Sequence, residues 1–269
     1  MRRLLTIFLP LGLALTAFVS SAAAQHAGDI AVGVVDDAVT TGFVNPDQTI
    51  TWDERIFLAT LGGSDATSDP GFDAAPGTFP SGSRIGFNAL AGLHVWDGDA
   101  FVPADGESMT ISFFTFASVT VEDGPIDGFD LNVDPTGAWH RHFTFLLNPA
   151  AGESAPAAGL FVLQLELYAV DAGLQPLHDP SAPFFIVFDH DAPPGEIDDA
   201  ATWLQDVYID PAPPCPADLS GDAIVDADDL FALLGAWGDC PDCAADLTSD
   251  GAVDADDLFA LLGAWGDCP

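Results

Sequence analysis

Residues 217–240, ADLSGDAIVDADDLFALLGAWGDC, and residues 245–268, ADLTSDGAVDADDLFALLGAWGDC, are nearly the same segment written twice. The two copies align at a shift of 28 residues and are identical at 20 of 24 positions. The four differences are Ser220/Thr248, Gly221/Ser249, Ala223/Gly251 and Ile224/Ala252. A repeat this faithful predicts two copies of one structural unit at the C-terminal end of the sequence.

Each copy spaces its oxygen-bearing residues as a twelve-residue calcium loop does, at positions 1, 3, 5, 7, 9 and 12, with a backbone carbonyl at position 7. A calcium ion takes six to eight oxygen ligands, whereas magnesium requires a tighter octahedron. Carboxylates gathered so closely repel one another without a cation. The pattern therefore predicts two calcium ions. Their ligands are Asp218, Ser220, Asp222, Ile224, Asp226 and Asp229 in the first loop, and Asp246, Thr248, Asp250, Ala252, Asp254 and Asp257 in the second.

The two loops differ at position 6, where a sharp turn favours glycine. Gly251 occupies this position in the second loop, but Ala223 occupies it in the first. A left-handed backbone costs a residue with a side chain about 1–2 kcal/mol. We therefore expect the first loop to bind calcium more weakly than the second.

A short amphipathic helix is expected after each loop. In the first copy Leu230, Leu233, Leu234 and Trp237 follow the i, i+3, i+4, i+7 spacing of one helical face. No comparable helix is expected before either loop. The unit is therefore a loop followed by an exit helix, used twice.

Two loop–helix units of this kind resemble type I dockerin domains, over about residues 215–269, in the cysteine-flanked variant found in planctomycete-like secreted proteins. The resemblance implies a small all-α domain that binds two calcium ions and docks onto a cohesin-like domain of a scaffold or surface protein. It also implies a frequent association with polysaccharide breakdown. The family uses positions 10 and 11 for recognition. Here these are Ala227-Asp228 and Ala255-Asp256, with an acidic residue where a small or hydroxyl residue is usual.

All four cysteines, Cys215, Cys240, Cys243 and Cys268, fall in this C-terminal part. An even, clustered set in an exported protein is typical of disulfides. If the two helices pack antiparallel, the start of one unit lies near the end of the other, which favours Cys215–Cys268 and Cys240–Cys243 as the pairs. A redox or zinc site at Cys240 and Cys243 is the alternative.

The beginning of the sequence indicates export. Arg2 and Arg3 precede an apolar run and small residues end at Ala24, a pattern typical of a cleaved signal peptide over residues 1–24. We expect a secreted, extracellular or periplasmic protein without a membrane span. Removing the two arginines takes the formal charge from −37 to −39. Nucleic acid is excluded as a partner because phosphates repel such a surface.

Residues 25–210 are predicted to form a mainly β, sandwich-like domain, joined by a stiff proline linker at 211–214 to the C-terminal domain. Short apolar runs alternate there with turn residues. The candidate strands are Ile30–Val35, Arg55–Leu61, Arg84–Trp96, Ser108–Val121, His140–Leu147, Leu160–Ala169 and Phe184–Phe188. A single helix is expected at Glu196–Val207.

His140 and His142 are two residues apart in a predicted strand, so they point to one face and could bind zinc. His26 is a candidate third ligand, and His190 with Asp191 ends another strand. The alternative is that these histidines are ordinary surface or half-buried side chains. The stretches at 67–73 and 183–188 resemble secreted β-rich bacterial proteins of unknown function, some of them tied to zinc-regulated expression.

Three functions stay open for the large domain. It could be a non-catalytic domain attached to an extracellular assembly, a polysaccharide-degrading or carbohydrate-binding protein, or a zinc-binding protein. No catalytic residue can be assigned, because no acid pair of a glycoside hydrolase can be chosen among 42 acids. A sugar-binding face could use Trp96, Phe113, Phe114 and Phe116, although such aromatic residues more often form core.

Overall fold

The computed structural model describes residues 27–61, 64–211, 215–240 and 243–268. The chain divides into two compact units, residues 1–201 and 202–269. The division therefore falls ahead of the expected linker at 211–214. The predicted signal peptide and His26 lie outside the described residues. None of the described helices is long and apolar enough to cross a membrane.

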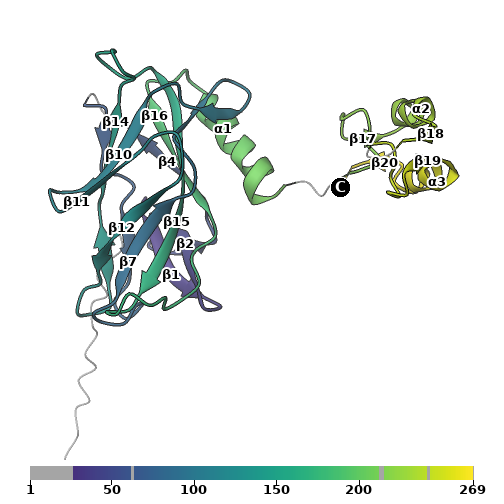
Figure 1. Cartoon of the computed structure of the whole chain (residues 1–269). Coiled ribbons are helices and arrows are strands. Elements are labelled where there is room, and N and C mark those ends of the chain that lie inside the picture. The colour runs from purple at the N-terminus through teal and green to yellow at the C-terminus, as the bar shows by residue number, and fades with distance from the viewer. Residues whose placement is uncertain (1–26, 62–63, 212–214, 241–242, 269) are drawn as a thin grey trace, which may run out of the picture. The chain divides into compact units, whose positions relative to one another are not determined.

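The first unit is mainly β, as expected, and its largest sheet has seven strands (Figure 1). The strand order is β12-β7-β15-β16-β4, while β8 pairs with part of β15 and β9 pairs with β8. The bounds are β4 Ile56–Thr60, β7 Arg84–Ala89, β8 His94–Trp96, β9 Phe101–Pro103, β12 Ile126–Asn132, β15 Gly159–Val170 and β16 Phe184–His190.

Two smaller sheets complete this unit. The five-stranded sheet has the order β13-β6-β1-β2-β3, and the four-stranded sheet has the order β11-β10-β14-β5. The bounds are β1 Ile30–Val35, β2 Ala38–Val44, β3 Ile50–Trp52, β5 Ala66–Thr67, β6 Phe72–Ala74, β10 Ser108–Phe113, β11 Ala117–Val121, β13 Trp139–Arg141 and β14 Thr144–Asn148.

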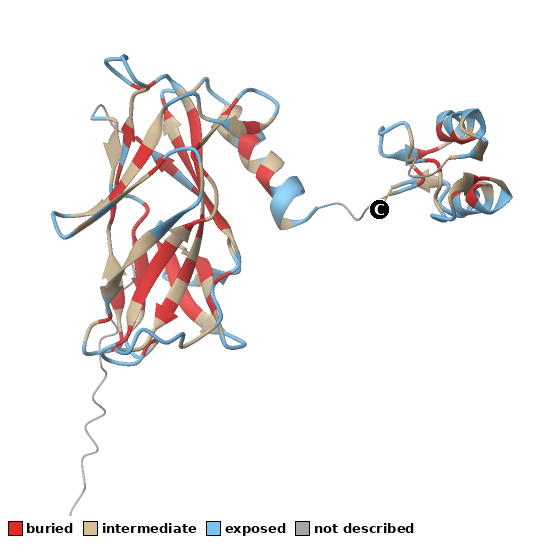
Figure 2. Ribbon diagram, viewed as in Figure 1, coloured by how far each residue is buried: buried red, intermediate tan, exposed pale blue. Residues whose placement is uncertain are grey.

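Aromatic side chains join the large sheet to both smaller ones. Phe188 of β16 packs on Phe145 of β14, with ring centroids 5.1 Å apart. Phe184 of the same strand packs on Phe72 of β6 at 6.3 Å. The inward side chains of all three sheets form one buried cluster. Figure 2 marks the buried residues of these strands in red. Burial of this apolar surface is the main force that holds the layers together.

Several predicted strands are in fact two separate strands each. The runs at 84–96, 108–121 and 140–147 were each expected to be one strand, and each contains two. At 108–121 the chain reverses in a tight turn, closed by the Phe116 N–H donating to the Phe113 carbonyl at 3.1 Å. Phe114 adopts a left-handed φ of 49° within it. Phenylalanine is not a residue that favours turns. Hydrophobic periodicity alone therefore predicts one continuous strand across this turn.

The expected helix at 196–207 is found, with a different end. Helix α1 spans Glu196–Leu204 and continues as a π-helical segment, Gln205–Ile209. Glu196, Asp198 and Asp199 occupy its first turn, where carboxylates interact favourably with the helix dipole.

The second unit contains the repeat, folded as two matching halves. Helices α2, Ala227–Gly235, and α3, Ala255–Gly263, each follow one loop. This unit is not purely helical, because four two-residue strands pair across the halves: β17 Ile224–Val225 with β20 Gly266–Asp267, and β18 Gly238–Asp239 with β19 Ala252–Val253.

Equivalent positions of the two repeats form the small core of this unit. Val225 and Leu233 of the first copy are buried together with Val253 and Leu261 of the second. The disulfides Cys215–Cys268 and Cys240–Cys243 are both present, which confirms the predicted pairs.

Candidate functional site

Three neighbouring strands bring one acidic and histidine-rich cluster together in the first unit. Strand β6 lies between β1 and β13. His140 of β13 is paired in register with Asp73 of β6, and Asp73 is paired with Ala31 of β1. Asp29 immediately precedes β1, and His142 immediately follows β13. Segments more than 100 residues apart in sequence therefore meet at one sheet edge.

One ligand atom from each of Asp29, His140 and His142 lies within 4.8 Å of the other two. The two imidazole ring centroids are 5.0 Å apart. Asp29 is buried, whereas the histidine side chains are partly exposed, at 38% for His140 and 32% for His142. The aspartate therefore forms the buried side of the cluster, and the two histidines form the side that solvent can reach. Among the described residues, no other set of three ligating side chains meets this spacing.

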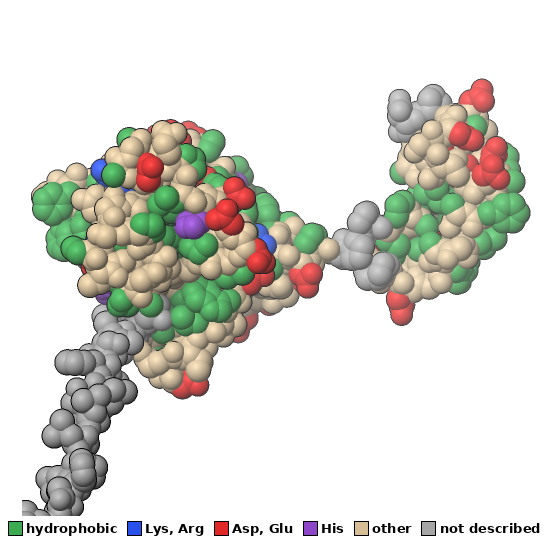
Figure 3. Space-filling model, turned by 90° about the horizontal axis from the view of Figure 1, so that it is seen from below, with side chains coloured by type: hydrophobic (Ala, Val, Ile, Leu, Met, Phe, Trp, Pro, Cys, Tyr) green, Lys and Arg blue, Asp and Glu red, His purple; other side chains and the backbone are tan. Residues whose placement is uncertain are grey.

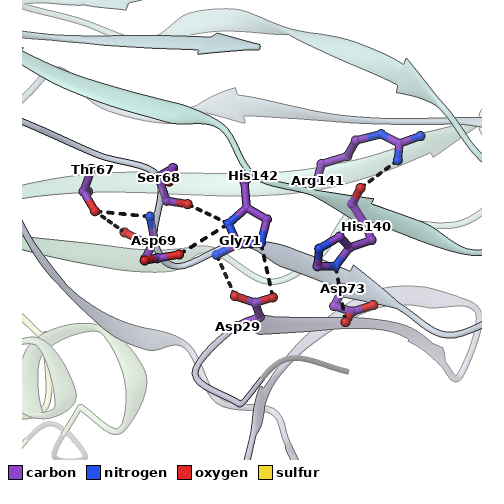
Figure 4. A network of polar contacts seen from close by, with 9 residues as sticks. All are labelled: Asp29, Thr67, Ser68, Asp69, Gly71, Asp73, His140, Arg141 and His142. Atoms are coloured by element: carbon purple, nitrogen blue, oxygen red, sulfur yellow. Dashed lines mark hydrogen bonds and ion pairs between the residues drawn. The ribbon is translucent and has the colours of Figure 1, made fainter. Parts of the chain in front are cut away.

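Further polar groups surround these three side chains (Figure 4). The Gly71 N–H donates to Asp29 Oδ1 at 3.0 Å. His142 Nδ1 lies 2.9 Å from the Ser68 carbonyl oxygen, and His142 Nε2 lies 3.7 Å from Asp29 Oδ2. Asp73 Oδ2 lies 3.4 Å from His140 Nδ1. Two imidazoles and a carboxylate at this separation are a donor set suited to zinc and other first-row transition metals.

Sequence reasoning identified His140 and His142 but not Asp29. Acidic residues are abundant in this chain, so one aspartate before a strand carries no local signal. Only the pairing of β1 and β13 on either side of β6 places Asp29 beside the histidines. His190, by contrast, lies at another site, where its ring nitrogens contact the Ala157 carbonyl at 2.8 Å and Asp65 at 3.0 Å.

In the C-terminal unit, the carboxylate at position 1 of each loop accepts hydrogen bonds from backbone N–H groups of the same loop. Asp218 at position 1 accepts N–H groups from Gly221, Asp222 and Ala223. Asp246 does the same in the second loop, for Asp250 and Gly251. These hydrogen bonds bend the backbone around the position-1 carboxylate. A loop that surrounds a calcium ion with oxygen ligands needs a bend of this kind.

The position-12 carboxylates close both loops from the helix side. Asp229 accepts the Ser220 N–H at 2.8 Å and the Asp226 N–H at 2.7 Å. Asp257 makes the matching pair with Thr248 and Asp254. Both side chains are fully shielded from solvent. Each also completes a capping box with the N-cap aspartate of its helix.

These hydrogen bonds keep the closing carboxylates ionised. The Asp226 N–H is the main cause that lowers the pKa of Asp229, and the Ser220 N–H adds to it against the opposing effect of desolvation. The pKa of Asp257 is lowered in the same way by the Asp254 and Thr248 N–H groups. Charged oxygens at position 12 are what a hard divalent cation binds.

The remaining predicted ligands lie around the same two turns. The Ser220 hydroxyl donates to Asp218 Oδ1 at 3.2 Å, and Asp222 Oδ1 accepts the Ile224 N–H at 3.0 Å. Asp250 accepts the Ala252 N–H at 3.0 Å in the second loop.

The four aromatic residues considered for a sugar-binding face separate into two groups. Trp96 is buried and Phe113 is half-buried. Phe114 and Phe116 are exposed, at 76% and 80%, on the turn between β10 and β11.

Comparison with known proteins identifies no relative of this chain. No protein-family model matches the chain, and a search of the curated proteins finds no match.

Proposed function

We propose that the β-rich unit binds a transition-metal ion, with zinc as the best candidate, through Asp29, His140 and His142. The observation that carries this proposal is the convergence of three ligand atoms within 4.8 Å. Neutral imidazole and carboxylate are common zinc ligands in proteins. A surface rich in acidic side chains and poor in Lys and Arg, as on the face in Figure 3, attracts cations toward such a site.

Metal analysis of the full-length protein tests this function. The protein is stripped with a chelator, reloaded with zinc and desalted, and its zinc content is measured. The double variant His140→Ala/His142→Ala should lose the zinc that the wild type retains. The matched control is His94→Ala/His178→Ala, which removes two histidines outside the cluster and should retain it. Equal zinc in all three proteins would remove the proposal.

A second function is proposed for the C-terminal unit, which would bind two calcium ions and dock onto a partner protein. The ligands are the twelve loop residues named above. Support comes from the carboxylates of both loops and from large exposed apolar side chains on and just after each helix. Phe231 and Trp237 on and after α2 are 69% and 50% exposed, and their repeats Phe259 and Trp265 are 68% and 49% exposed. Large apolar side chains held in water mark interaction surfaces.

Together these proposals describe an exported protein whose dockerin-like module attaches a metal-binding, non-catalytic β-rich domain to an extracellular assembly. The partner would be a cohesin-like domain. Binding of the full-length protein to a panel of purified cohesin-like domains, in calcium and in chelator, tests this. We expect binding that requires calcium.

The exposed phenylalanines of the two helices supply a sharper test of docking. Phe231→Ser/Phe259→Ser should abolish partner binding while calcium binding persists. Leu58→Ser, at a 50% exposed leucine of β4, is the control and should bind normally. A partner that binds equally with and without calcium would contradict the docking function.

A further inference from the structure

The segment Ser68–Gly71 contacts two of the three side chains in the proposed metal site. Its first residue offers a backbone carbonyl to His142 Nδ1 at 2.9 Å. Its second residue, Asp69, places Oδ1 3.3 Å from the same nitrogen. Its last residue, Gly71, donates its N–H to Asp29 Oδ1 at 3.0 Å. One short stretch, remote in sequence from both ligands, therefore holds an imidazole and a carboxylate at once (Figure 4).

The contact with Ser68 determines which nitrogen of His142 can bind a metal. A backbone carbonyl oxygen only accepts hydrogen bonds, so Nδ1 must carry the proton. Neutral imidazole has a single N–H, which leaves the lone pair on Nε2. Nε2 is the nitrogen that faces Asp29 Oδ2, at 3.7 Å. Metal-binding histidines are commonly oriented in this way through their other ring nitrogen.

The contact with Gly71 likewise distinguishes the two oxygens of Asp29. Oδ1 is engaged by the Gly71 N–H, while Oδ2 lies on the side of His142. Asp29 therefore places Oδ2 toward the proposed ion.

Gly71 also has no room for a side chain. A Cβ atom placed on Gly71 would lie 2.6 Å from Cε1 and from Nε2 of His142. Real Cβ atoms do not approach so closely, and both atoms belong to the edge of the ring that would face the ion. Any side chain at position 71 must therefore displace the imidazole of His142 from its observed place.

We propose that Ser68, Asp69 and Gly71 are positioning residues that set the metal site before the ion binds, with His142 Nε2 and Asp29 Oδ2 as ligands. This inference rests on the metal-binding function proposed above. It adds which atoms bind and why a side chain at position 71 should weaken metal binding. Partners of this kind typically change metal affinity by about 10- to 100-fold when they are altered.

Nuclear magnetic resonance of the metal-free, full-length protein tests the orientation of His142. Proton–nitrogen spectra of the imidazoles, at a pH where His142 is neutral, distinguish a protonated Nδ1 from a protonated Nε2. The His142→Asn variant assigns the signals. We expect the proton on Nδ1 in the absence of metal and after zinc is added. A proton on Nε2 in the metal-free protein would overturn the inference even if zinc binds.

Zinc affinity of Gly71→Ala, measured by competition with a chromophoric chelator, tests the steric argument. We expect affinity to fall about 10- to 100-fold while the circular dichroism spectrum is unchanged. The control is Gly124→Ala, because a Cβ there meets no atom within 4 Å. Wild-type affinity in Gly71→Ala would overturn the inference alone. A wild type that binds no zinc would instead refute the metal-binding function itself. If Gly71→Ala does not fold, the spectra of the wild type still decide.

Discussion

His190 is a buried residue whose two ring nitrogens both face acceptors. The Ala157 carbonyl and the Asp65 carboxylate can only accept, so both contacts are satisfied at once only when the ring carries two N–H groups. Burial alone would lower the pKa of His190. The hydrogen bonds to Ala157 and Asp65, together with the charges of Asp65 and Asp191, raise it above its ordinary value.

Because the folded pKa of His190 is raised, its protonated form stabilises the folded state. This contribution is fully present below the unfolded pKa and is lost as the pH rises through the folded pKa. We expect the thermal midpoint of the β-rich unit to fall as the pH rises above about 6.5, the ordinary value for histidine. Calorimetry across this range measures the effect. Asp65→Asn should flatten the slope, and an unchanged slope would show that this contact is not responsible.

The two predicted calcium loops differ in which residues adopt a left-handed backbone, and this alters one expectation. Ala223 does adopt a positive φ, 66°, at position 6, where Gly251 has 91°. At position 4, however, the first loop has Gly221 at 80° and the second has Ser249 at 58°. Each loop therefore contains one strained residue with a side chain. Backbone strain alone no longer ranks the first loop below the second.

Glycine at the strained position should therefore strengthen either loop. Ala223→Gly and Ser249→Gly should each raise calcium affinity, by up to about 1–2 kcal/mol if the left-handed backbone is adopted only when calcium binds. Isothermal titration calorimetry on the full-length protein measures both sites. Gly235→Ala, at an open position of α2, is the control. A gain in Ala223→Gly alone would restore the expectation that the first loop is the weaker.

At the scale of elements, helices α2 and α3 each present two apolar faces. Leu233 and Leu261 point into the small core, while Phe231 and Phe259 remain exposed. Helical periodicity predicted one continuous stripe that included Leu234 and Trp237. In the structure these two residues are exposed instead, since a unit this small buries only one line of side chains from each helix.

The disulfide Cys215–Cys268 joins the two ends of the repeat, at a sequence separation of 53 residues. Loop-closure entropy predicts that removing it destabilises this unit by about 4 kcal/mol. Cys240–Cys243 closes a separation of only 3 residues and should matter far less. Denaturant unfolding in calcium of Cys215→Ser/Cys268→Ser and Cys240→Ser/Cys243→Ser compares them. Equal losses in both variants would argue against the entropic explanation.

For the whole molecule, the two compact units imply two separate unfolding transitions. Calcium that binds only the folded C-terminal unit should raise its transition by mass action. We expect that adding calcium moves one calorimetric peak upward and leaves the other in place, and that a chelator reverses the shift. Movement of both peaks together would show that the units unfold as one.

The sequence by itself determined whatever depends on local spacing. Ligand positions recur every few residues within each loop, so Asp218 and Asp229 could be proposed as calcium ligands without a fold. The β class followed from alternation in segments such as Ser108–Phe113, and both disulfides followed from the antiparallel packing expected of a repeat. Loop geometry is set by neighbours in the chain, which is why a pattern of this kind is informative.

Only the tertiary structure decided how distant segments meet. Asp29 joins His140 and His142 because β6 pairs with β1 on one side and β13 on the other, and no local pattern encodes that order. Tertiary structure alone likewise places the Ser68–Gly71 segment against His142 and Asp65 beside His190. Contacts between segments far apart in sequence depend on how the apolar faces of all three sheets pack, a property of the whole unit that short stretches of sequence do not specify.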